Sequence, residues 1–392
     1  MAGIYFHIPF CKQACHYCDF HFSTSLQYKT DLLEAMKQEL KLQANYLQDA
    51  QIETIYFGGG TPSILTPSEI KQLIEELAHY YRISPTPEIT LEANPDDLDT
   101  KKVTELRNTP INRFSIGIQS FFDEDLKWMN RAHTAQEATA SIKRVQDAGF
   151  ENITADLIYG FPLLSQEKWI SNISQLLTFH IPHISAYSLT VEPRTALAHA
   201  IHTGKQPHID DEQSAQQFLW LIDMMREAAY EHYEISNFAL PHHYAQHNTN
   251  YWKAIPYLGI GPSAHSYNGF ERQWNVSNNN QYMKAIFSQH IPAEMESLSL
   301  TDRLNEYIMT ALRTMWGIDL NFIGQTFGYP CLRDLLKRAE IFKTHHQLIE
   351  EDTHLKLTTT GKLIADTIAA ALFEENVYAI ADKYEKESQH PH

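Results

Sequence analysis

Cysteine is scarce in this chain of 392 residues, which contains four, and long apolar runs are missing. No stretch reaches the roughly 18 apolar residues that a membrane-spanning helix needs, so we expect no membrane anchor. The first residues, Met1 to Tyr5, have neither the basic nor the apolar segment of a secretion signal. Because clustered free thiols persist in a reducing compartment, we expect a cytoplasmic protein.

Positive charge is also scarce, since 31 lysines and arginines stand against 48 aspartates and glutamates, for a formal net charge of -17. A nucleic-acid-binding protein needs a basic face for phosphate contacts, so we expect no nucleic-acid partner. Hydrophobic residues make up 43% of the chain, enough for well-packed cores. A chain of this length predicts two or three structural units.

Three of the four cysteines are clustered. Cys11, Cys15 and Cys18 stand in a C-x3-C-x2-C spacing directly after the apolar segment Ile4 to Ile8. Thiolates this close in sequence can converge on one soft metal centre. Three of them would leave one iron of a 4Fe-4S cluster without a protein ligand and open to chemistry.

A zinc site is the alternative interpretation of the same cysteines. Cys3His is a common structural zinc set, and three histidines lie close enough in sequence to complete it: His7, His16 and His21. Structural zinc motifs usually combine two separated pairs of ligands, and no second pair is present here. The remaining cysteine, Cys331, is predicted to be a buried thiol. Broad absorption near ~400 nm would indicate iron and sulfide, whereas a zinc site is colourless.

Short β-branched segments alternate with helical patterns over the first 210 residues. The predicted strands are 3–8, 52–57, 88–92, 113–118, 153–158 and 183–189, and the main predicted helices are 28–47, 67–81, 134–148 and 166–179. Successive βα units predict an α/β fold with a parallel sheet. Six units are too few for a closed eight-unit barrel, so the pattern predicts a partial (β/α)6 barrel resembling the TIM barrel.

The unusual residues follow the carboxyl ends of these strands, where parallel α/β folds place their reactive groups. They are the cysteines, Gly58 to Pro62, Glu92 to Pro95, Gln119 to Ser120, Tyr159 to Pro162 and Thr190 to Pro193. The glycines let a ligand approach the backbone closely. Glu92, Gln119 and Asp156 could bind hydroxyl or amine groups, and Arg131 could hold a carboxylate. Each could instead be an ordinary cap or loop residue.

The cysteine spacing after a first strand, with Tyr17 before the last cysteine and Gly-Gly-Gly-Thr-Pro after the second strand, resembles the radical S-adenosylmethionine (SAM) superfamily. The resemblance implies that SAM chelates the open iron of a 4Fe-4S cluster. One electron, supplied by an electron donor, would then cleave SAM to a 5'-deoxyadenosyl radical. The cofactors would carry this chemistry, and the protein would orient them and exclude water.

Within the superfamily, the chain is similar to the oxygen-independent coproporphyrinogen III dehydrogenase group. Tyr5 to Cys11 and Asp156 to Gly160 match that group's signatures, although Asn130 stands before Arg131 where a glycine is usual. The similarity implies the following SAM contacts: Tyr5, Gly59, Gly60, Thr61, Glu92, Gln119, Arg131, Asp156 and Thr190.

A branch of that group, the HemW-type haem chaperones, is more similar still. The dehydrogenases have a fourth cysteine where this chain has Phe20, and a long N-terminal segment where ten residues precede Cys11. The blocks 233–239, 247–252 and 258–266 are typical of the chaperones. This resemblance implies haem binding and transfer to an acceptor, for example a membrane respiratory protein. Radical decarboxylation of a porphyrinogen is the alternative function.

The block His-Asn-Thr-Asn-Tyr-Trp contains the candidate haem-binding residues. The imidazole of His247 suits iron, and Tyr251 and Trp252 offer flat apolar surfaces to a porphyrin. A histidine beside aromatic residues can equally be a hydrogen-bonded core residue, and this chain has 21 histidines. His265 is a weaker candidate in a turn-like segment.

The predicted domains are a radical SAM barrel over 1–210, an irregular helical and aromatic cover region over 211–298, a winged-helix-like domain over 299–380 and a polar tail over 381–392. In the third domain, predicted helices precede a hairpin over 348–357. Its acidic residues oppose phosphate contact, so a docking or cover role is expected instead of DNA binding. They are Glu350, Glu351, Asp352 and Asp366.

Overall fold

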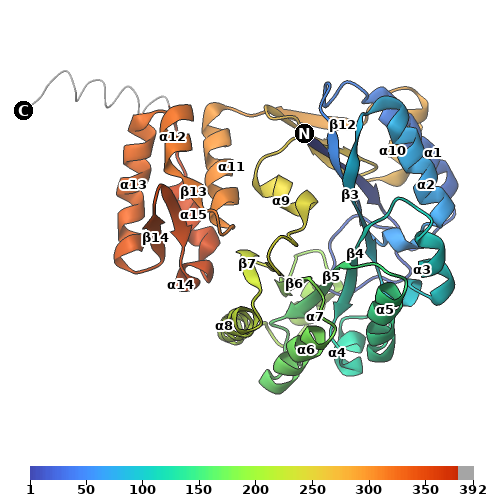
Figure 1. The fold of residues 1–392 in the computed structure, drawn as a ribbon, viewed down its shortest axis with the longest axis horizontal. Coiled ribbons are helices and arrows are strands. Elements are labelled where there is room, and N and C mark those ends of the chain that lie inside the picture. The colour runs from blue at the N-terminus through green and yellow to red at the C-terminus, as the bar shows by residue number, and fades with distance from the viewer. Residues whose placement is uncertain (378–392) are drawn as a thin grey trace, which may run out of the picture. The chain divides into compact units, whose positions relative to one another are not determined.

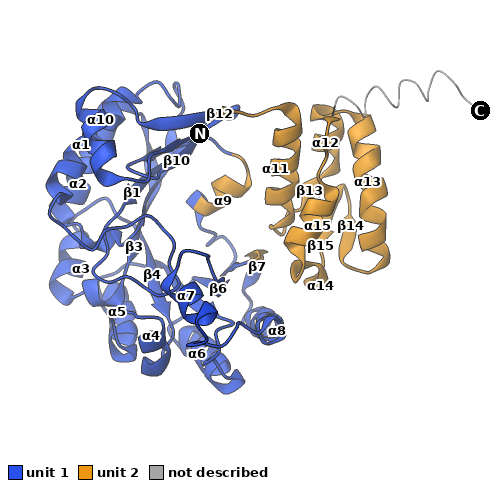
Figure 2. Cartoon of the chain, turned by 180° about the vertical axis from the view of Figure 1, so that it is seen from behind, with its two compact units in different colours: residues 1–231, 236–247, 255–295 blue, residues 232–235, 248–254, 296–392 orange. Residues whose placement is uncertain are grey.

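The computed structural model describes residues 1–377, and the predicted polar tail over 381–392 lies outside them (Figure 1). The chain divides into two compact units (Figure 2). Unit 1 comprises Met1–Glu231, Ser236–His247 and Ile255–Met295, and unit 2 comprises His232–Ile235, Asn248–Ala254 and the described residues from Glu296 to Val377. Among residues 1–377, no helix is long and apolar enough to cross a membrane.

Six parallel strands form the centre of unit 1 and pair in chain order, which confirms the predicted parallel sheet. They are β1 (Ala2–Ile8), β2 (Ile52–Gly59), β3 (Ile83–Ala93), β4 (Arg113–Gln119), β5 (Asn152–Tyr159) and β6 (His183–Ser188). The helices between them lie along the outer side of the curved sheet (Figure 1): α1 (Lys29–Leu42), α2 (Pro67–Tyr80), α3 (Thr100–Leu106), α4 (Asp123–Trp128), α5 (Ala135–Asp147) and α6 (Gln166–Thr178). Two 3-10 turns, Pro62–Ile64 and Pro95–Asp97, and α7 (Ala196–His202) complete this part.

Local sequence signals fix where these helices begin. Thr66 accepts a hydrogen bond from the backbone of Glu69, whose side chain accepts one in return from the Thr66 backbone, and Pro67 opens α2. This capping box satisfies two amide groups that the first helical turn leaves unpaired. Thr134 and Glu137 repeat the device at the start of α5. The apolar faces that follow are buried against the sheet.

The region predicted as irregular contains short strands that extend the sheet at both edges. Its elements are α8 (Asp211–Glu227), β7 (Glu231–Glu234), β8 (Asn237–Ala239), α9 (Gln246–Trp252), β9 (Tyr257–Ile260), β10 (His265–Tyr267), β11 (Glu271–Asn275), α10 (Asn279–Phe287) and β12 (Ala293–Ser297). In unit 1, β9 pairs in parallel with β1, and β8 pairs in antiparallel with β6. Strands of three to five residues show too little alternation to be recognised in the sequence.

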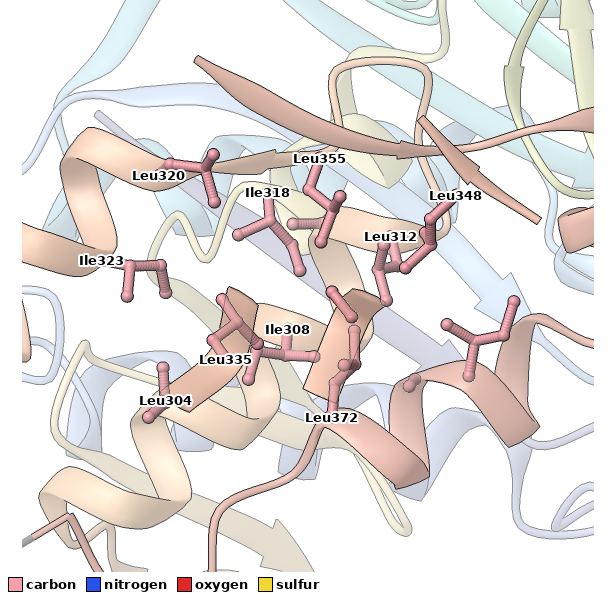
Figure 3. Close-up of a cluster of buried hydrophobic side chains, with 14 of the residues drawn as sticks. Leu304, Ile308, Leu312, Ile318, Leu320, Ile323, Leu335, Leu348, Leu355 and Leu372 are labelled. Atoms are coloured by element: carbon pink, nitrogen blue, oxygen red, sulfur yellow. The ribbon is translucent and has the colours of Figure 1, made fainter. Parts of the chain in front are cut away.

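Unit 2 has the predicted helices and hairpin. Its main elements are α11 (Leu300–Leu312), β13 (Ile318–Asp319), α12 (Leu320–Thr326), α13 (Tyr329–Thr344), β14 (Leu348–Glu351), β15 (His354–Leu357), α14 (Thr359–Lys362) and α15 (Ala365–Leu372). The three strands form a small antiparallel sheet. Leucine and isoleucine side chains from the helices and both hairpin strands meet in one core (Figure 3). Cys331 is 2% exposed within this core, as the sequence predicts.

The side chains enclosed by the central sheet of unit 1 are polar and contact one another across the strands. Arg113 on β4 bonds the hydroxyls of Thr90 on β3 and Thr154 on β5, and Thr154 also contacts His183 on β6 at 3.0 Å. Buried polar groups are stable only with such partners. Arg113 and His183 are the first residues of β4 and β6, so part of this polar interior lies at the amino ends of the strands. The predicted site lies at the opposite, carboxyl edge of the sheet.

Candidate functional site

The loop that carries the three cysteines is held by bonds to neighbouring loops. The Cys11 amide donates to the Ser23 carbonyl at 3.0 Å, and Lys12 forms ion pairs with Asp96 and Asp97. Asn130 donates to the Ala14 carbonyl at 2.7 Å. Its φ is 58°, in the left-handed region where glycine is usual and which asparagine tolerates. The unusual Asn130 therefore anchors the cysteine loop.

Two of the thiols have polar neighbours from other loops. The Thr61 hydroxyl donates to Cys11 Sγ at 3.5 Å, and Arg131 Nη1 donates to Cys15 Sγ at 3.5 Å. Burial raises the pKa of Cys11 and raises the pKa of Cys18 to about 11. Thiols with raised pKa values ionise when a metal centre binds them. All four cysteines are free, and no three histidine, cysteine or carboxylate side chains within residues 1–377 lie close enough to share one metal ion.

Glycines are required at the end of β2 and directly after it, because neighbouring segments of the chain approach closely there. A Cβ on Gly60 would lie 2.6 Å from the Phe10 carbonyl oxygen, and Gly59 has a φ of +107°. The Gly60 amide donates to the Ile8 carbonyl at 2.9 Å. This packing brings the Gly-Gly-Gly-Thr-Pro turn against the start of the cysteine loop. A ligand bound between the turn and the loop would therefore contact both segments.

Two carboxylates face the same edge from β3 and β5. Glu92 accepts a hydrogen bond from the Tyr56 hydroxyl at 2.7 Å, and Asp156 accepts from Ser115 at 3.3 Å. Burial raises the pKa of Asp156 to about 6. Burial, with a smaller contribution from the negative charge of Asp156, raises the pKa of Glu92 to about 7. Both side chains are half-buried, so they can accept hydrogen bonds from hydroxyl or amine groups of a ligand.

Gln119 lies in a strained turn at the end of β4. Its φ is 65°, and the Ser120 amide donates to the Ile118 carbonyl at 2.8 Å, which closes a three-residue turn around it. Such turns with a positive central φ are rare and strained. Gln119 is 9% exposed, and its Oε1 has no hydrogen-bond partner in the described chain. A buried oxygen without a partner fits a site that receives a polar ligand.

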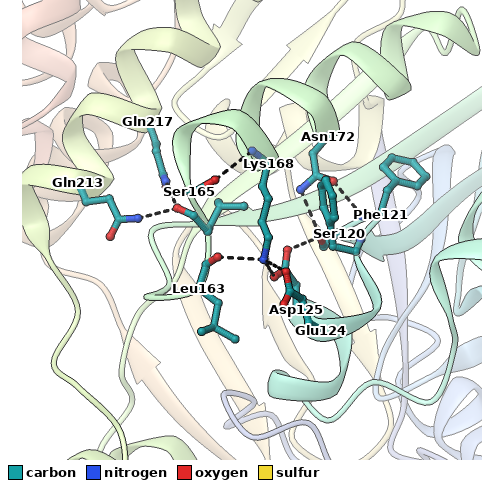
Figure 4. Close-up of polar contacts among 12 residues, drawn as sticks. Ser120, Phe121, Glu124, Asp125, Leu163, Ser165, Lys168, Asn172, Gln213 and Gln217 are labelled. Carbon is teal, nitrogen blue, oxygen red and sulfur yellow. Dashed lines mark hydrogen bonds and ion pairs between the residues drawn. The ribbon is translucent and has the colours of Figure 1, made fainter.

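A buried network holds the residues that follow Gln119 (Figure 4). Ser120 donates to Asp125 at 2.7 Å, and Asn172 on α6 bonds both the Ser120 hydroxyl and the Phe121 amide. Lys168 donates to Asp125 at 3.0 Å. Strained conformations persist where the surroundings enforce them, and this network supplies that enforcement.

Arg131 connects the cysteine loop to β4 and to the segment that follows β3. Its Nη2 donates to Asn94 Oδ1 at 2.6 Å and to the Gly117 carbonyl at 2.9 Å. Asn94 in turn donates to Thr61 at 3.2 Å. The Arg131 Nε is buried without a hydrogen-bond partner in the described chain. The guanidinium therefore has a donor left for a carboxylate ligand.

The other predicted residues differ in their exposure and in their contacts with the site. Tyr5 is half-buried and contacts His7 Nδ1 at 3.3 Å, while Tyr17 is half-buried on the cysteine loop. Phe20 is 65% exposed, and Thr190 is exposed after β6. Thus most of the predicted SAM set gathers at one edge of the sheet, whereas no contact described within residues 1–377 joins Thr190 to that set.

The interior partners of the site were not predicted. Tyr56 and Ser115, which orient the two carboxylates, and Arg113 deeper in the sheet alternate with apolar residues on their strands. In otherwise buried strands, polar residues that alternate with apolar ones with a period of two are the sequence signal that could have identified these partners. Asn94 lay within the Glu-Ala-Asn-Pro segment that the sequence already marked as unusual.

The candidate haem residues are divided between the two units. His247 belongs to unit 1, is 2% exposed and contacts the Thr54 hydroxyl through Nδ1 at 2.8 Å. Burial lowers its pKa to about 3, so the ring is neutral. Tyr251 and Trp252 belong to unit 2, where Arg313 lies 5.4 Å from the centre of the Trp252 ring. His265 is exposed at the start of β10.

Comparisons with known proteins agree with this geometry. Residues 5–174 match the Radical SAM superfamily, and residues 298–364 match the HemN C-terminal domain. The chain is 30% identical over 385 residues to "Heme chaperone HemW" of Bacillus subtilis (strain 168), which covers 96% of this chain and 100% of that protein. It is 33% identical over 314 residues to the protein of the same name from Lactococcus lactis, covering 80% and 82% of the two chains.

The structure of coproporphyrinogen III oxidase (HemN) from Escherichia coli has the same fold. Its TM-score is 0.84 at 21% identity, covering 96% of this chain and 90% of that one. The sheet, the cysteine loop and the matched region define a radical SAM protein, a class that uses a 4Fe-4S cluster and SAM. Within that class, this chain belongs to the HemW family.

Proposed function

We propose that this chain binds haem and passes it to an acceptor protein, with the 4Fe-4S cluster and SAM controlling the transfer. The observation that carries the proposal is the similarity to the HemW haem chaperones over nearly the whole chain. Phe20 supports it, because the resemblance places a fourth cysteine of the dehydrogenases at this position.

In this proposal Cys11, Cys15 and Cys18 hold the cluster. The residues at the sheet edge bind SAM: Tyr5, Gly59, Gly60, Thr61, Glu92, Gln119, Arg131, Asp156 and Thr190. When bound, the cluster and SAM supply one-electron chemistry. The chain's own groups fit them, because the thiols are free and the Gln119 oxygen is buried without a partner. The Arg131 guanidinium suits the SAM carboxylate, and Glu92 and Asp156 suit its hydroxyl and amine groups.

The partners of the proposed reaction are haem, a haem acceptor such as a membrane respiratory protein, and an electron donor for the cluster. We propose a cytoplasmic location and no nucleic-acid partner, since the net charge is -17. His247 is the proposed iron ligand, with Tyr251 and Trp252 as porphyrin contacts. Because the His247 ring is 2% exposed, it must move to reach haem iron.

The test is a haem titration of anaerobically reconstituted protein, followed by its Soret absorption. Saturable binding near one haem per chain, and delivery of that haem to an apo-acceptor, is the expected result. His247→Ala should weaken binding and alter the Soret band, whereas His79→Ala, at an exposed position on α2, should not. Absence of specific haem binding, together with conversion of coproporphyrinogen III to protoporphyrinogen IX, would show that the chain is a dehydrogenase instead.

A further inference from the structure

His247 occupies a defined place inside the sheet of unit 1. Its backbone amide donates to Glu88 Oε1 at 3.1 Å, and the amide of Gln246 donates to Glu88 Oε2 at 3.2 Å. Its ring nitrogen Nδ1 contacts Thr54. Two strands of the sheet, β2 and β3, therefore fix both the backbone and the ring of His247.

The His247 ring packs against the tyrosine that orients Glu92. Its centroid lies 5.1 Å from that of Tyr56, with the planes 26° apart, and 6.4 Å from that of Tyr5. Gly3 makes room for the imidazole, because a Cβ there would lie 3.1 Å from His247 Cε1. The three rings form one stacked layer beneath the sheet edge.

Tyr56 connects the His247 ring to Glu92 at the carboxyl edge of the sheet. It is 7% exposed, and its hydroxyl donates to Glu92 Oε1 at 2.7 Å. The Gly59 amide is the other donor that holds the Glu92 carboxylate. Both donors come from β2, so the position of the Tyr56 ring determines the direction in which Glu92 presents its remaining lone pairs.

We propose that His247 is a positioning residue for the SAM site, which supports Tyr56 so that the Tyr56 hydroxyl holds Glu92 toward SAM. This inference rests on the proposed function only in that Glu92 contacts SAM. It gives the histidine of the His-Asn-Thr-Asn-Tyr-Trp block a role at the sheet edge that does not require haem. The His247 ring supports Tyr56 by direct packing, because it lies between Gly3 and the Tyr56 ring.

The electrostatics of Glu92 provide a second readout. The groups that face it are Tyr56, Tyr5, Asp156 and Arg113. The Tyr56 hydrogen bond lowers the pKa of Glu92, against the larger upward effect of burial. Removing the hydroxyl therefore raises the Glu92 pKa from its value of about 7, so that the carboxyl is protonated over more of the neutral pH range. SAM affinity should then reach its maximum at a higher pH.

The experiment measures SAM binding to reconstituted protein by calorimetry between pH 6 and pH 8.5, with iron content checked for each variant. Tyr56→Phe removes only the hydroxyl and keeps the ring that packs on His247. It should lower SAM affinity at pH 7 about tenfold, the effect of one lost hydrogen bond to a charged group, and move the pH midpoint upward. Tyr81→Phe, at a buried tyrosine that bonds the Gln43 carbonyl, is the matched control and should bind SAM normally.

Three further variants separate the possible results: His247→Ala, the double variant that combines it with Tyr56→Phe, and Glu92→Gln. His247→Ala should lower SAM affinity in the same direction, and the double variant should lose less than the sum of the two single effects. If Glu92→Gln weakens SAM binding but Tyr56→Phe does not, the positioning role is wrong while the SAM site stands. If neither changes it, both the positioning role and the SAM contact of Glu92 are wrong. Loss of haem binding with unchanged SAM affinity in His247→Ala would also overturn this inference.

Discussion

The side-chain amide of Asn172 on α6 makes two hydrogen bonds with the turn that follows β4. Its Nδ2 donates to the Ser120 hydroxyl at 3.2 Å, and its Oδ1 accepts from the Phe121 amide at 2.9 Å (Figure 4). Asn172 and Ser120 are both fully buried. A helix on the outside of the sheet thereby stabilises the strained turn that presents Gln119 to the site.

Replacement of Asn172 by alanine should destabilise unit 1 by about 1 to 3 kcal/mol, because it leaves the buried Phe121 amide without its partner. The Ser120 hydroxyl loses one bond but still donates to Asp125. The same change should weaken SAM binding, since the Gln119 turn loses its support. Denaturant unfolding and calorimetry measure the two effects. Ser171→Ala, at the adjacent exposed position, should change neither quantity. Wild-type stability in Asn172→Ala would show that the turn does not depend on this amide.

Each cluster cysteine should be individually necessary for iron. Replacing Cys11, Cys15 or Cys18 by alanine leaves two thiolates, too few to hold the cluster, so the purified variants should lack brown colour and acid-labile sulfide. Cys331→Ala is the control, because Cys331 lies in the core of unit 2. It should keep the iron content of the wild type. Full iron and sulfide in any of the three cluster variants would contradict the assignment of that ligand.

Arg131→Lys should lower SAM affinity by tenfold or more while the cluster still forms. Lysine keeps the positive charge but cannot bond Asn94, the Gly117 carbonyl and a ligand carboxylate together, because it lacks the planar fork of the guanidinium. Calorimetric titration with SAM measures the change. Arg144→Lys, where Arg144 donates to the Leu98 carbonyl at 3.2 Å, offers a control arginine outside the site. Equal SAM affinity in Arg131→Lys and wild type would exclude a carboxylate-binding role.

Glu39 should make unit 1 less stable as the pH rises toward 8. This carboxyl of α1 is fully buried, accepts bonds from Tyr282, Asn275 and the Gly261 amide, and has its pKa raised by burial to about 7. A raised folded pKa contributes stability that is fully present below the unfolded pKa of about 4.5 and is lost as the pH rises through 7. The contribution is on the order of 3 kcal/mol.

Thermal unfolding at pH 5 and pH 8 measures this dependence. The decrease in melting temperature between the two pH values should be smaller in Glu39→Gln, because glutamine does not ionise. Glu34→Gln, at an exposed position on the same helix, should retain the wild-type dependence. An unchanged pH dependence in Glu39→Gln would show that Glu39 keeps an ordinary pKa.

The parallel core could be predicted because its signals are local. Each of the six strands shows β-branched periodicity, and helices such as α2 begin at a capping box that is visible in the sequence. The added strands β8 to β11 could not be predicted, since three to five residues without a strong pattern become strands only by pairing with an existing edge. The proposed SAM residues were predicted from family resemblance and strand position, whereas Tyr56 and Asn172 were not predicted.

The class of the fold, the three-cysteine spacing and the edge of the sheet where the polar residues gather can all be read from the sequence. These features depend on residues close together in the chain, so period and spacing are sufficient. Which distant side chains meet is known from the folded chain alone: Glu88 contacts the amide of His247, and Tyr56 contacts Glu92. The reason is physical, because contacts between separate strands depend on how the whole sheet curves and packs. The local sequence pattern does not show how the sheet curves and packs.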